Sequence, residues 1–378
     1  MEGLFMVQLQ TAANQAVWEQ ICRKVDAVLP RMAGKCPHVA KSDGIYDDTR
    51  LDWWTSGFWP GILWIMHDMT GEQRYKDAAW SWDERIEQLF LTENRYDHDV
   101  GFQFLPTAVI KHKITGDKDG ARRGLFAANF LAGRFNLKGN FIRAWKADKT
   151  GWSIVDTAMN LSLLFWAAKE SGDPRFMHVA RAHADTVVRQ FIREDGSTYH
   201  IVRFDPETGE RADAIGGQGA APESAWSRGA AWALYGMTNA YTHTGDETYL
   251  RAAQRVAHFF IAHLPEDGVP YWDFRADEEE GGIPRDSSAG ACAASGLIDL
   301  AGHLGDTQGR GYRAAAEHIL GSLYQSYGTW DNTTHEGMLL QGTGNRPADE
   351  NVNVSLIYGD YFFVEATAKL NGWKHRIF

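Results

Sequence analysis

The stretch that decides the fold runs from Leu161 to Phe191 and reads LSLLFWAAKESGDPRFMHVARAHADTVVRQF. The helical pattern that it continues, from Ile154 to Ala168, is apolar on nearly every side, so that helix must be buried. The pattern from Phe176 to Phe191 carries Arg, His and Asp on one side, which is typical of a helix that covers a buried one. Between them, Gly172 can adopt the left-handed conformation that ends a helix, and Asp173 can cap the next helix. The stretch therefore predicts a hairpin of two antiparallel helices.

The same turn recurs along the chain. Further copies read Thr70-Gly71-Glu72, Thr115-Gly116-Asp117, Thr244-Gly245-Asp246 and Leu304-Gly305-Asp306. With helical patterns near residues 12–30 and 359–371, they predict an all-α protein of about six antiparallel helix pairs. Buried leading helices and amphipathic trailing helices fit an inner barrel wrapped by an outer one, although an open solenoid of hairpins also fits the repeat.

The connections between the helix pairs vary in length. The longest, from Asp195 to Ala225, is expected to hold a short β-hairpin, because STYHIVRFD has strand composition and PETGE is a turn. Loops of this length are usually functional. No low-complexity linker interrupts the chain, so we expect residues 1–378 to form one domain.

Charge and composition exclude several classes of function. The 378 residues include 38 Lys and Arg against 49 Asp and Glu, a net charge of −11, so the protein repels the phosphate backbone of nucleic acid. No segment approaches about 20 uninterrupted apolar residues, and the first residues lack the pattern of a signal peptide, so we expect no membrane association. Three cysteines without a CxxC or metal-binding spacing fit a reducing compartment, and we expect a cytoplasmic protein.

The segment Tyr96-Asp97-His98-Asp99-Val100-Gly101-Phe102 places two carboxylates around a histidine. Such a group could bind a metal ion or transfer protons, whereas the simpler interpretation is an Asx turn before a helix that starts near Pro106. As a metal site the segment lacks a second histidine at helical spacing, so we predict no metal.

Asp156 directly precedes the apolar helix TAMNLSLLFWAA. Its spacing from Ser153 is that of a capping box, and the helix dipole stabilises a carboxylate in a first turn. In an inner ring, however, Asp156 would face the mouth of the barrel. Burial and a neighbouring carboxylate such as Asp99 would there raise its pKa against the dipole, and the sequence leaves the balance open.

Arg228 and Trp232 stand four residues apart in SAWSRGAAW and so share one helical face. A guanidinium can grip a carboxylate at two points while an indole stacks on a sugar ring, but a surface Arg packed on a core Trp explains the pattern equally well. His200 and Gln218 lie on the long connection before this helix, as candidate site residues or as plain loop residues.

Tryptophan is dense between Leu51 and Gly61, which read LDWWTSGFWPG. Core packing explains one or two of these rings. Three indoles and a phenylalanine are more than one buried face needs, so we expect some of them, Trp54 among them, to line a cleft.

Together these segments resemble the unsaturated glucuronyl hydrolases, glycoside hydrolase family 88. The resemblance covers nearly the whole chain and rests on GFWPGILW, DHDVGF, the Asp before TAMNLSLLFWA, STYH, WSRGAAW, EDGVPYWDF and GDY at residues 359–361. It implies an (α/α)6 barrel without a metal or organic cofactor. It also implies a substrate that is an unsaturated uronic-acid disaccharide or short oligosaccharide left by a polysaccharide lyase.

The resemblance also implies residue roles. The essential acid of the family corresponds to Asp156 and its second carboxylate to Asp99, and the sugar-contacting positions correspond to Trp54, His98, Trp145, His200, Gln218, Arg228 and Trp232. The family protonates C4 of the C4=C5 double bond and adds water at C5, after which the hemiketal falls apart and releases the aglycone. We expect Asp156 to serve both proton transfers. We expect Arg228 to pair with the substrate carboxylate, and Trp54 and Trp232 to stack on the sugar.

Three alternatives stay open. The unsaturated rhamnogalacturonyl hydrolases share the barrel and the chemistry but rely on one principal Asp, so the presence of both Asp99 and Asp156 favours the glucuronyl group. An isomerase that resembles N-acylglucosamine 2-epimerase would need paired catalytic histidines, which His98 and His200 could imitate. A sugar-binding barrel without activity is the third.

One departure from the family concerns sulfate. Some members that accept sulfated glycosaminoglycans have a Ser and Lys cluster where this chain reads PADENVN at residues 347–353. Asp349 and Glu350 would repel a sulfate, so we expect a preference for unsulfated substrates.

Overall fold

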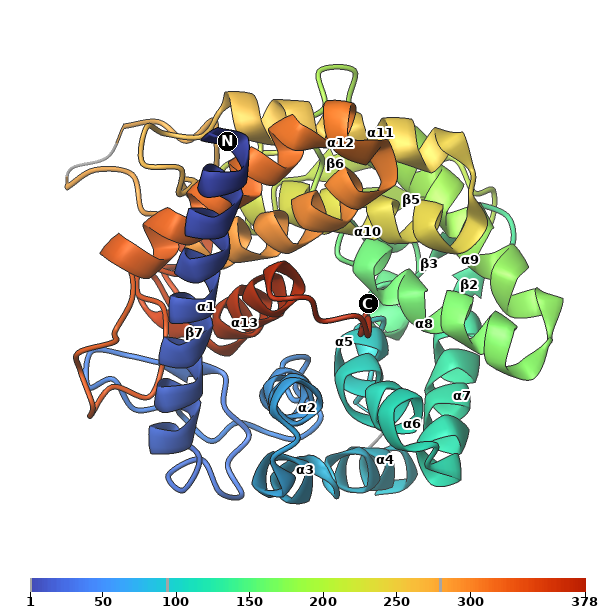
Figure 1. Ribbon diagram of the computed structural model, residues 1–378. Coiled ribbons are helices and arrows are strands. Elements are labelled where there is room, and N and C mark those ends of the chain that lie inside the picture. Colours follow the sequence, from blue (N-terminus) through green and yellow to red (C-terminus); the bar gives the residue numbers. More distant parts are fainter. Residues whose placement is uncertain (1, 93–94, 279–280) are drawn as a thin grey trace.

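The computed structural model describes residues 2–92, 95–278 and 281–378, and it shows two concentric rings of helices (Figure 1). Within the described residues the inner ring consists of α2 (Phe58–Thr70), the continuous segment α5 (Val100–Phe104), η1 (Leu105–Val109) and α6 (Ile110–Thr115), then α8 (Thr157–Ser171), α10 (Ser227–Thr244), the first half of α12 (Ser287–Ser326) and α13 (Ile357–Leu370). Each member packs against the next, and α13 packs against α2. The ring is therefore closed, which confirms the barrel and excludes the open solenoid.

The outer ring covers the inner one, as the amphipathic patterns predict. It is built from α1 (Glu2–Val28), α3 (Gln73–Ala79), α4 (Trp82–Thr92), α7 (Lys118–Ala132), α9 (Pro174–Thr186) with its π-helical end η3 (Val187–Phe191), α11 (Glu247–Ala262) and the second half of α12. Inner helices are almost wholly buried: in α8 every residue from 157 to 167 is buried. In the described ranges, no helix is long and apolar enough to cross a membrane.

Four of the five repeated turns have the predicted geometry. Gly71, Gly116, Gly172 and Gly245 are in the left-handed conformation, whereas Gly305 has a φ of 69° but a ψ of 176°. In three copies the next residue caps the following helix, because a backbone N–H donates to the side chain of Asp117, Asp173 or Asp246. These short turns join the C-terminal ends of inner helices to the outer ring.

Short strands occupy the opposite end of the barrel. The predicted hairpin is confirmed as β5 (Ile201–Phe204) and β6 (Arg211–Ile215), and β4 (Trp152–Ile154) extends it to an antiparallel sheet of order β4-β5-β6. Two smaller pairs are β1 (Val39–Ala40) with β7 (Ser355–Leu356) and β2 (Phe135–Asn136) with β3 (Phe141–Ile142). Two single 3-10 turns, η2 (Ala147–Lys149) and η4 (Arg346–Ala348), lie in the same connections.

The long connections all enter the inner helices at their N-terminal ends. Residues 47–57, 133–156, 192–226 and 327–356 therefore converge at one end of the barrel, where they precede α2, α8, α10 and α13. Long loops on a rigid scaffold are where binding and catalytic residues concentrate. The fold thus directs the search for a site to this end.

Candidate active site

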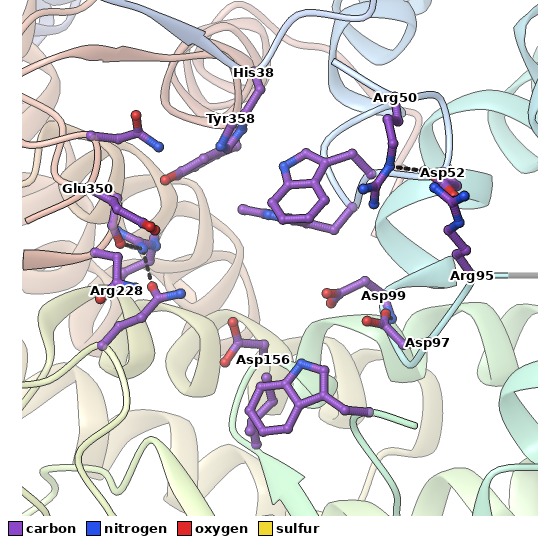
Figure 2. Close-up of a pocket in the computed structure, with 18 of the residues that line it drawn as sticks. His38, Arg50, Asp52, Arg95, Asp97, Asp99, Asp156, Arg228, Glu350 and Tyr358 are labelled. Carbon is purple, nitrogen blue, oxygen red and sulfur yellow. Dashed lines mark hydrogen bonds and ion pairs between the residues drawn. The ribbon is translucent and has the colours of Figure 1, made fainter. Parts of the chain in front are cut away.

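A cavity of about 650 Å³ opens where the long connections converge (Figure 2). Seven of the nine predicted site residues line it: Trp54, Asp99, Trp145, Asp156, His200, Gln218 and Arg228. His98 and Trp232 lie outside its lining. Its volume lies in the range that suits a small organic ligand, and a disaccharide has that size.

Asp156 stands at the N-cap position of α8, directly after strand β4. Its side chain is 17% exposed, and Oδ2 is a buried atom without a hydrogen-bond partner among the described residues. The predicted capping box is wrong, because the Asp156 side chain caps no backbone N–H. Ser153 instead belongs to β4 and donates its hydroxyl to the Ile142 carbonyl at 3.0 Å. The strand thus leaves the Asp156 carboxyl free to face the cavity.

Burial raises the pKa of Asp156 from 3.8 to about 7. Arg228 and a backbone N–H lower this pKa, and Asp97 raises it further. Desolvation therefore outweighs the opposing effects of Arg228 and the backbone hydrogen bond on this pKa. Asp97, rather than the expected Asp99, is the carboxylate that raises the pKa of Asp156. A carboxyl with this pKa can give and take a proton near neutrality.

His200 lies beside Asp156 because the β4–β5 pairing brings the two segments together, with the Val155 N–H donating to the His200 carbonyl at 3.0 Å. The backbone N–H of Gln218 donates to Nδ1 of His200 at 2.9 Å, and the Gly216 carbonyl lies farther from the same nitrogen, at 3.3 Å. The shorter contact requires a lone pair on Nδ1, which places the proton of the neutral ring on Nε2. Burial lowers the pKa of His200 to about 3, which keeps the ring neutral. Nε2 lies 3.6 Å from Oδ2 of Asp156. The Nε2–H group is therefore a neutral dipole directed at the acid.

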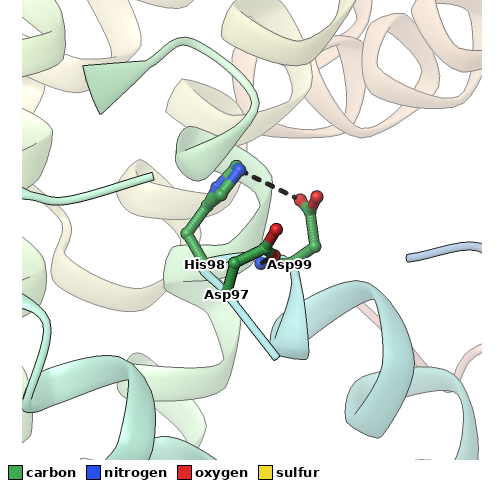
Figure 3. A group of neighbouring side chains, drawn as sticks. All are labelled: Asp97, His98 and Asp99. Atoms are coloured by element: carbon green, nitrogen blue, oxygen red, sulfur yellow. Dashed lines mark hydrogen bonds and ion pairs between the residues drawn. The ribbon is translucent and has the colours of Figure 1, made fainter. Parts of the chain in front are cut away.

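Figure 3 shows how Asp97, His98 and Asp99 cluster at the start of α5. Their potential ligand atoms lie within 4.8 Å of one another. Asp97 Oδ1 accepts the backbone N–H of Asp99 at 3.0 Å, which is the predicted Asx turn. The helix begins at Val100, however, and Pro106 lies inside the π-helical turn η1.

The three side chains of this cluster already have protein partners. Besides the Asp97 bond, His98 Nδ1 lies 2.9 Å from the Thr157 hydroxyl, and Asn160 Nδ2 donates to Oδ1 of Asp99 at 3.2 Å. His98 is 1% exposed and stands behind Asp99, with its Nε2 3.6 Å from Oδ1 of Asp99. His98 therefore does not line the cavity, and its ring lies behind Asp99.

Asp99 and Asp156 form an interacting pair. Their carboxyl groups both point into the cavity in Figure 2. Burial raises the pKa of Asp99 well above its usual range, with further increases from the charges of Asp97 and Asp156, while the hydrogen bond from Asn160 lowers it. Because the charge of Asp156 raises the pKa of Asp99, the two carboxyls do not both ionise easily, and the pair retains a proton at neutral pH.

Arg228 is held more firmly than the sequence suggests. Its Nη1 donates to Asp286 Oδ2 at 2.5 Å and to the Thr343 carbonyl at 2.6 Å. Its Nη2 donates at 2.6 Å to both Gln218 Oε1 and the Gly344 carbonyl. The expected two-point grip on a substrate carboxylate is therefore blocked in this arrangement. The side chain is a clamp that joins α10, the start of α12 and the segment around residue 343.

Trp54 and Trp145 provide the aromatic walls of the cavity. The Trp54 ring packs 4.8 Å from Tyr358, which fixes its orientation. The expected stacking role of Trp232 is wrong, because Trp232 is completely buried, with its ring 5.1 Å from Phe102. Arg228 lies in the first turn of α10 and reaches the cavity, whereas a residue one turn further along an inner helix lies in the core.

Sequence reasoning missed several lining residues. Tyr358 directly precedes the GDY segment, and Arg50, Arg95 and Lys146 line the cavity together with His38. These residues come from three separate connections and the first turn of α13 and share no spacing, so no signal could have grouped them. With Arg228, the basic residues offset the acids in the cavity wall.

The buried acid generates a prediction about stability. Asp156 ionises near 3.8 when unfolded and near 7 when folded, so between these pH values the unfolded state loses a proton that the folded state keeps. Stability is therefore lost as the pH rises from about 4 to about 7. We expect Asp156→Asn to increase the free energy of unfolding by about 1–3 kcal/mol at pH 8 and to leave it unchanged at pH 3.5, measured by denaturant titration.

Asp205 is the control for that experiment, because the backbone N–H groups of Thr208 and Glu207 lower its pKa. The Asp205→Asn variant should have a lower free energy of unfolding than the wild type above pH 4, which is the opposite of the change expected for Asp156→Asn. Equal stability of the wild type and Asp156→Asn at pH 8 would contradict a desolvated Asp156.

Comparison with known proteins agrees with this geometry. A family model described as Glycosyl Hydrolase Family 88 matches residues 24–242. The chain is 34% identical to the unsaturated glucuronyl hydrolase of Bacillus sp. (strain GL1), over 90% of this chain and 92% of that protein. It is 31% identical to the unsaturated chondroitin disaccharide hydrolase of Streptococcus pneumoniae (strain ATCC BAA-255 / R6), over 93% and 90% of the two chains. The solved structure of the Bacillus sp. GL1 enzyme matches with a TM-score of 0.90 at 32% identity, over 94% and 97% of the two chains. The chain therefore belongs to glycoside hydrolase family 88, as the resemblance predicts, and is a glycoside hydrolase.

Proposed function

We propose that the protein removes the 4,5-unsaturated uronic acid from the non-reducing end of disaccharides and short oligosaccharides left by polysaccharide lyases. One observation carries the proposal: Asp156 Oδ2 is buried, has no hydrogen-bond partner within the part of the chain that the structure describes, and faces a cavity that also holds Asp99. The names of the two relatives, an unsaturated glucuronyl hydrolase and an unsaturated chondroitin disaccharide hydrolase, support the substrate class.

The reaction needs one group that gives a proton and then takes one back. Protonated Asp156 delivers its proton to C4 of the enol ether, which leaves positive charge on C5 and the ring oxygen. The resulting Asp156 carboxylate accepts a proton from water as the water oxygen bonds to C5. The C5 hemiketal then opens, and the hemiacetal at C1 releases the aglycone and an open-chain keto acid. One water is consumed, and Asp156 ends protonated as it began.

His200 assists both states of the acid. Its Nε2–H dipole, 3.6 Å from Asp156 Oδ2, stabilises the carboxylate that forms when the proton leaves. Because burial keeps the pKa of His200 near 3, the ring does not compete for the proton. A neutral donor stabilises the carboxylate without holding Asp156 permanently ionised.

The uronate carboxylate is recognised at Arg228. In this structure Gln218 Oε1 occupies a position 2.6 Å from Arg228 Nη2, as an oxygen of the substrate would. If the Gln218 side chain rotates, Arg228 Nη2 is free to donate a hydrogen bond to the substrate carboxylate. The Gln218 amide group can then donate a second hydrogen bond to the same carboxylate. The other three Arg228 bonds hold the guanidinium still. Asp99 bonds the sugar hydroxyls on the far side, and the Trp54 indole covers the ring.

The alternatives explain less of the geometry. The histidine pair that the sequence offers for an epimerase does not form, because His98 is buried behind Asp99 and, of this pair, His200 alone lines the cavity. A hydrolase that depends on one acid does not use the second carboxyl, yet Asp99 and Asp156 both line the cavity.

We also propose that the protein works in the cytoplasm. Its three cysteines, Cys22, Cys36 and Cys292, are all unpaired. Unpaired thiols are usual in a reducing compartment. Lyase products short enough to be imported are then the physiological substrates.

Two variants test the assignment of the acids. Asp156→Asn keeps the shape and removes the proton, so it should lower kcat by about a thousandfold or more and leave the Kd for substrate within a few fold. Asp99→Asn should also lose most activity. Turnover is followed by the loss of ultraviolet absorbance of the conjugated double bond, and binding by calorimetry.

Retention of activity by Asp156→Asn would refute the role of this acid. Isomerised product with its double bond intact would indicate an epimerase instead. Binding without turnover in the wild type would indicate a sugar-binding barrel.

The sulfate preference follows from the cavity wall. Glu350 lines the cavity, so a sulfate on the aglycone meets a negative charge. We expect kcat/KM for an unsulfated disaccharide to exceed that for its sulfated counterpart by about tenfold. The Glu350→Gln variant should show a smaller ratio between these two kcat/KM values. Equal kcat/KM values for the two substrates in the wild type would contradict this preference.

A further inference from the structure

After α13 the chain turns back and enters the middle of the inner ring, as Figure 1 shows. Gly372 makes this turn, because its φ of 90° lies in the left-handed range that favours glycine. The segment that follows, residues 373–378, includes Ile377 and Phe378, whose side chains are 0% and 2% exposed. Residues 373–378 therefore fill part of the barrel interior, and we call them the barrel plug.

The barrel plug is fastened to three inner helices near their C-terminal ends. Asp68 Oδ2 of α2 accepts the indole N–H of Trp373 at 2.8 Å. Lys113 Nζ of α6 donates to the Arg376 carbonyl at 2.6 Å, and Arg376 Nη1 donates to the Thr242 hydroxyl of α10 at 3.4 Å. These helices carry the short glycine turns at the same ends. The plug thus closes the end of the barrel that lies opposite the cavity.

Inside the barrel, the plug packs against the layer of aromatic rings beneath the cavity. The ring of Phe378 lies 5.6 Å from that of Phe102 and 5.8 Å from that of Phe362. Phe102 is 1% exposed, and its ring lies 5.7 Å from Trp54, which lines the cavity. Phe102 therefore connects the plug to the cavity wall.

Phe102 also connects to Asp99, the second carboxyl of the site. The backbone N–H of Phe102 donates to Asn160 Oδ1 at 2.8 Å, and Asn160 Nδ2 donates to Asp99 Oδ1 at 3.2 Å. The contact between the two helices is tight, since a Cβ on Gly101 would lie 2.4 Å from Asn160 Oδ1. A shift of Phe102 therefore disturbs the hydrogen bond that orients the Asp99 carboxyl.

The helix that carries Phe102 depends on its neighbours for its position. α5 has five residues and passes directly into the π-helical turn η1. A helix of this length is marginal by itself, so packing of its side chains holds it in place. Loss of the Phe378 ring would leave a cavity, and the surrounding side chains would relax into part of it.

We propose that the barrel plug positions Asp99 for catalysis, with Phe378 supporting Phe102 from the end of the barrel opposite the cavity. The proposal rests on the proposed function and deepens it, because it assigns a positioning role to a residue that does not line the cavity. Phe378 acts through Phe102 and Asn160, and it touches no substrate.

Phe378→Ala tests the proposal. We expect kcat on an unsaturated uronide to fall about tenfold and KM to change by less than about threefold, because a displaced Asp99 slows the chemical step. Phe378→Leu fills most of the space, so its kcat should recover to about a third of the wild-type value.

Phe176→Ala is the matched control, since Phe176 is also 2% exposed and lies in the first turn of α9, near the same end of the barrel. It should lower Tm, as Phe378→Ala does, and leave kcat unchanged. An unchanged kcat in Phe378→Ala, or an equal fall in both variants, would overturn the proposal. If Phe378→Ala does not fold, Phe378→Leu and Phe176→Leu provide the same comparison.

A double variant shows whether Phe378 acts through Asp99. The kcat of Asp99→Asn/Phe378→Ala should agree within about twofold with that of Asp99→Asn, because the carboxyl that Phe378 positions is already absent. A further tenfold loss in the double variant would show a general effect on the fold and would contradict the positioning role.

Carbon-13 NMR of the Asp side chains separates this proposal from the proposed function. The Asp99 carboxyl resonance, identified by its loss in Asp99→Asn, should shift in Phe378→Ala and stay in place in Phe176→Ala. This result supports the positioning role even if the wild type turns over no unsaturated uronide. An Asp99 resonance that does not shift in Phe378→Ala refutes the role even if the wild type is active.

Discussion

The desolvation of one carboxyl group is the constraint on which the rest of the structure depends. Asp156 stands at a helix N-terminus, where the dipole favours the ionised form, and Arg228 acts in the same direction. Burial nonetheless raises its pKa to about 7. An acid that protonates a carbon–carbon double bond must keep its proton until the substrate arrives, and it must then work as a base within the same site. Only a balance of opposing influences gives both abilities to one side chain.

The barrel creates this balance by its connectivity. Short glycine turns occupy one end of the closed ring, so the long connections gather at the other end and cover the N-termini of the inner helices. Ser153 belongs to strand β4 and therefore does not cap helix α8. The pairing of β4 with β5 brings His200 close to Asp156. Arg228 donates hydrogen bonds to Asp286, Gln218 and two backbone carbonyls. Its charge thus remains near the acid without forming an ion pair with it.

Much of the fold could be predicted from the sequence, because its signals are local. The turn at Gly172 and the apolar pattern of α8 depend on residues within a few positions of one another, and the β5–β6 hairpin follows from its own composition. Asp156 and Asp99 could be identified as candidates, together with the opposing terms of the Asp156 pKa. How strongly each effect shifts the pKa of Asp156 depends on burial by segments that are far away in the chain. The resulting pKa could therefore not be predicted from the sequence.

The errors have the same origin. The spacing of Ser153 and Asp156 matches a capping box, but pairing of β4 with a strand some 50 residues later removes Ser153 from that role. Helical spacing correctly puts Trp232 and Arg228 on one face of α10. Arg228 reaches the cavity because it lies in the first turn of this helix, whereas Trp232 lies one turn further into the barrel core. The clamp on Arg228 involves residues 58 and 115 positions away, which no local pattern encodes.

The most direct test of the account is the titration of the Asp156 carboxyl itself. Carbon-13 NMR of protein labelled at the Asp side chains, compared with the same spectrum of Asp156→Asn, identifies this resonance and follows its shift with pH. A buried Asp156 carboxyl should titrate with a midpoint near pH 7. A midpoint near pH 4, the ordinary value for a solvated aspartate, would show that Asp156 holds no proton at neutrality and would contradict the account.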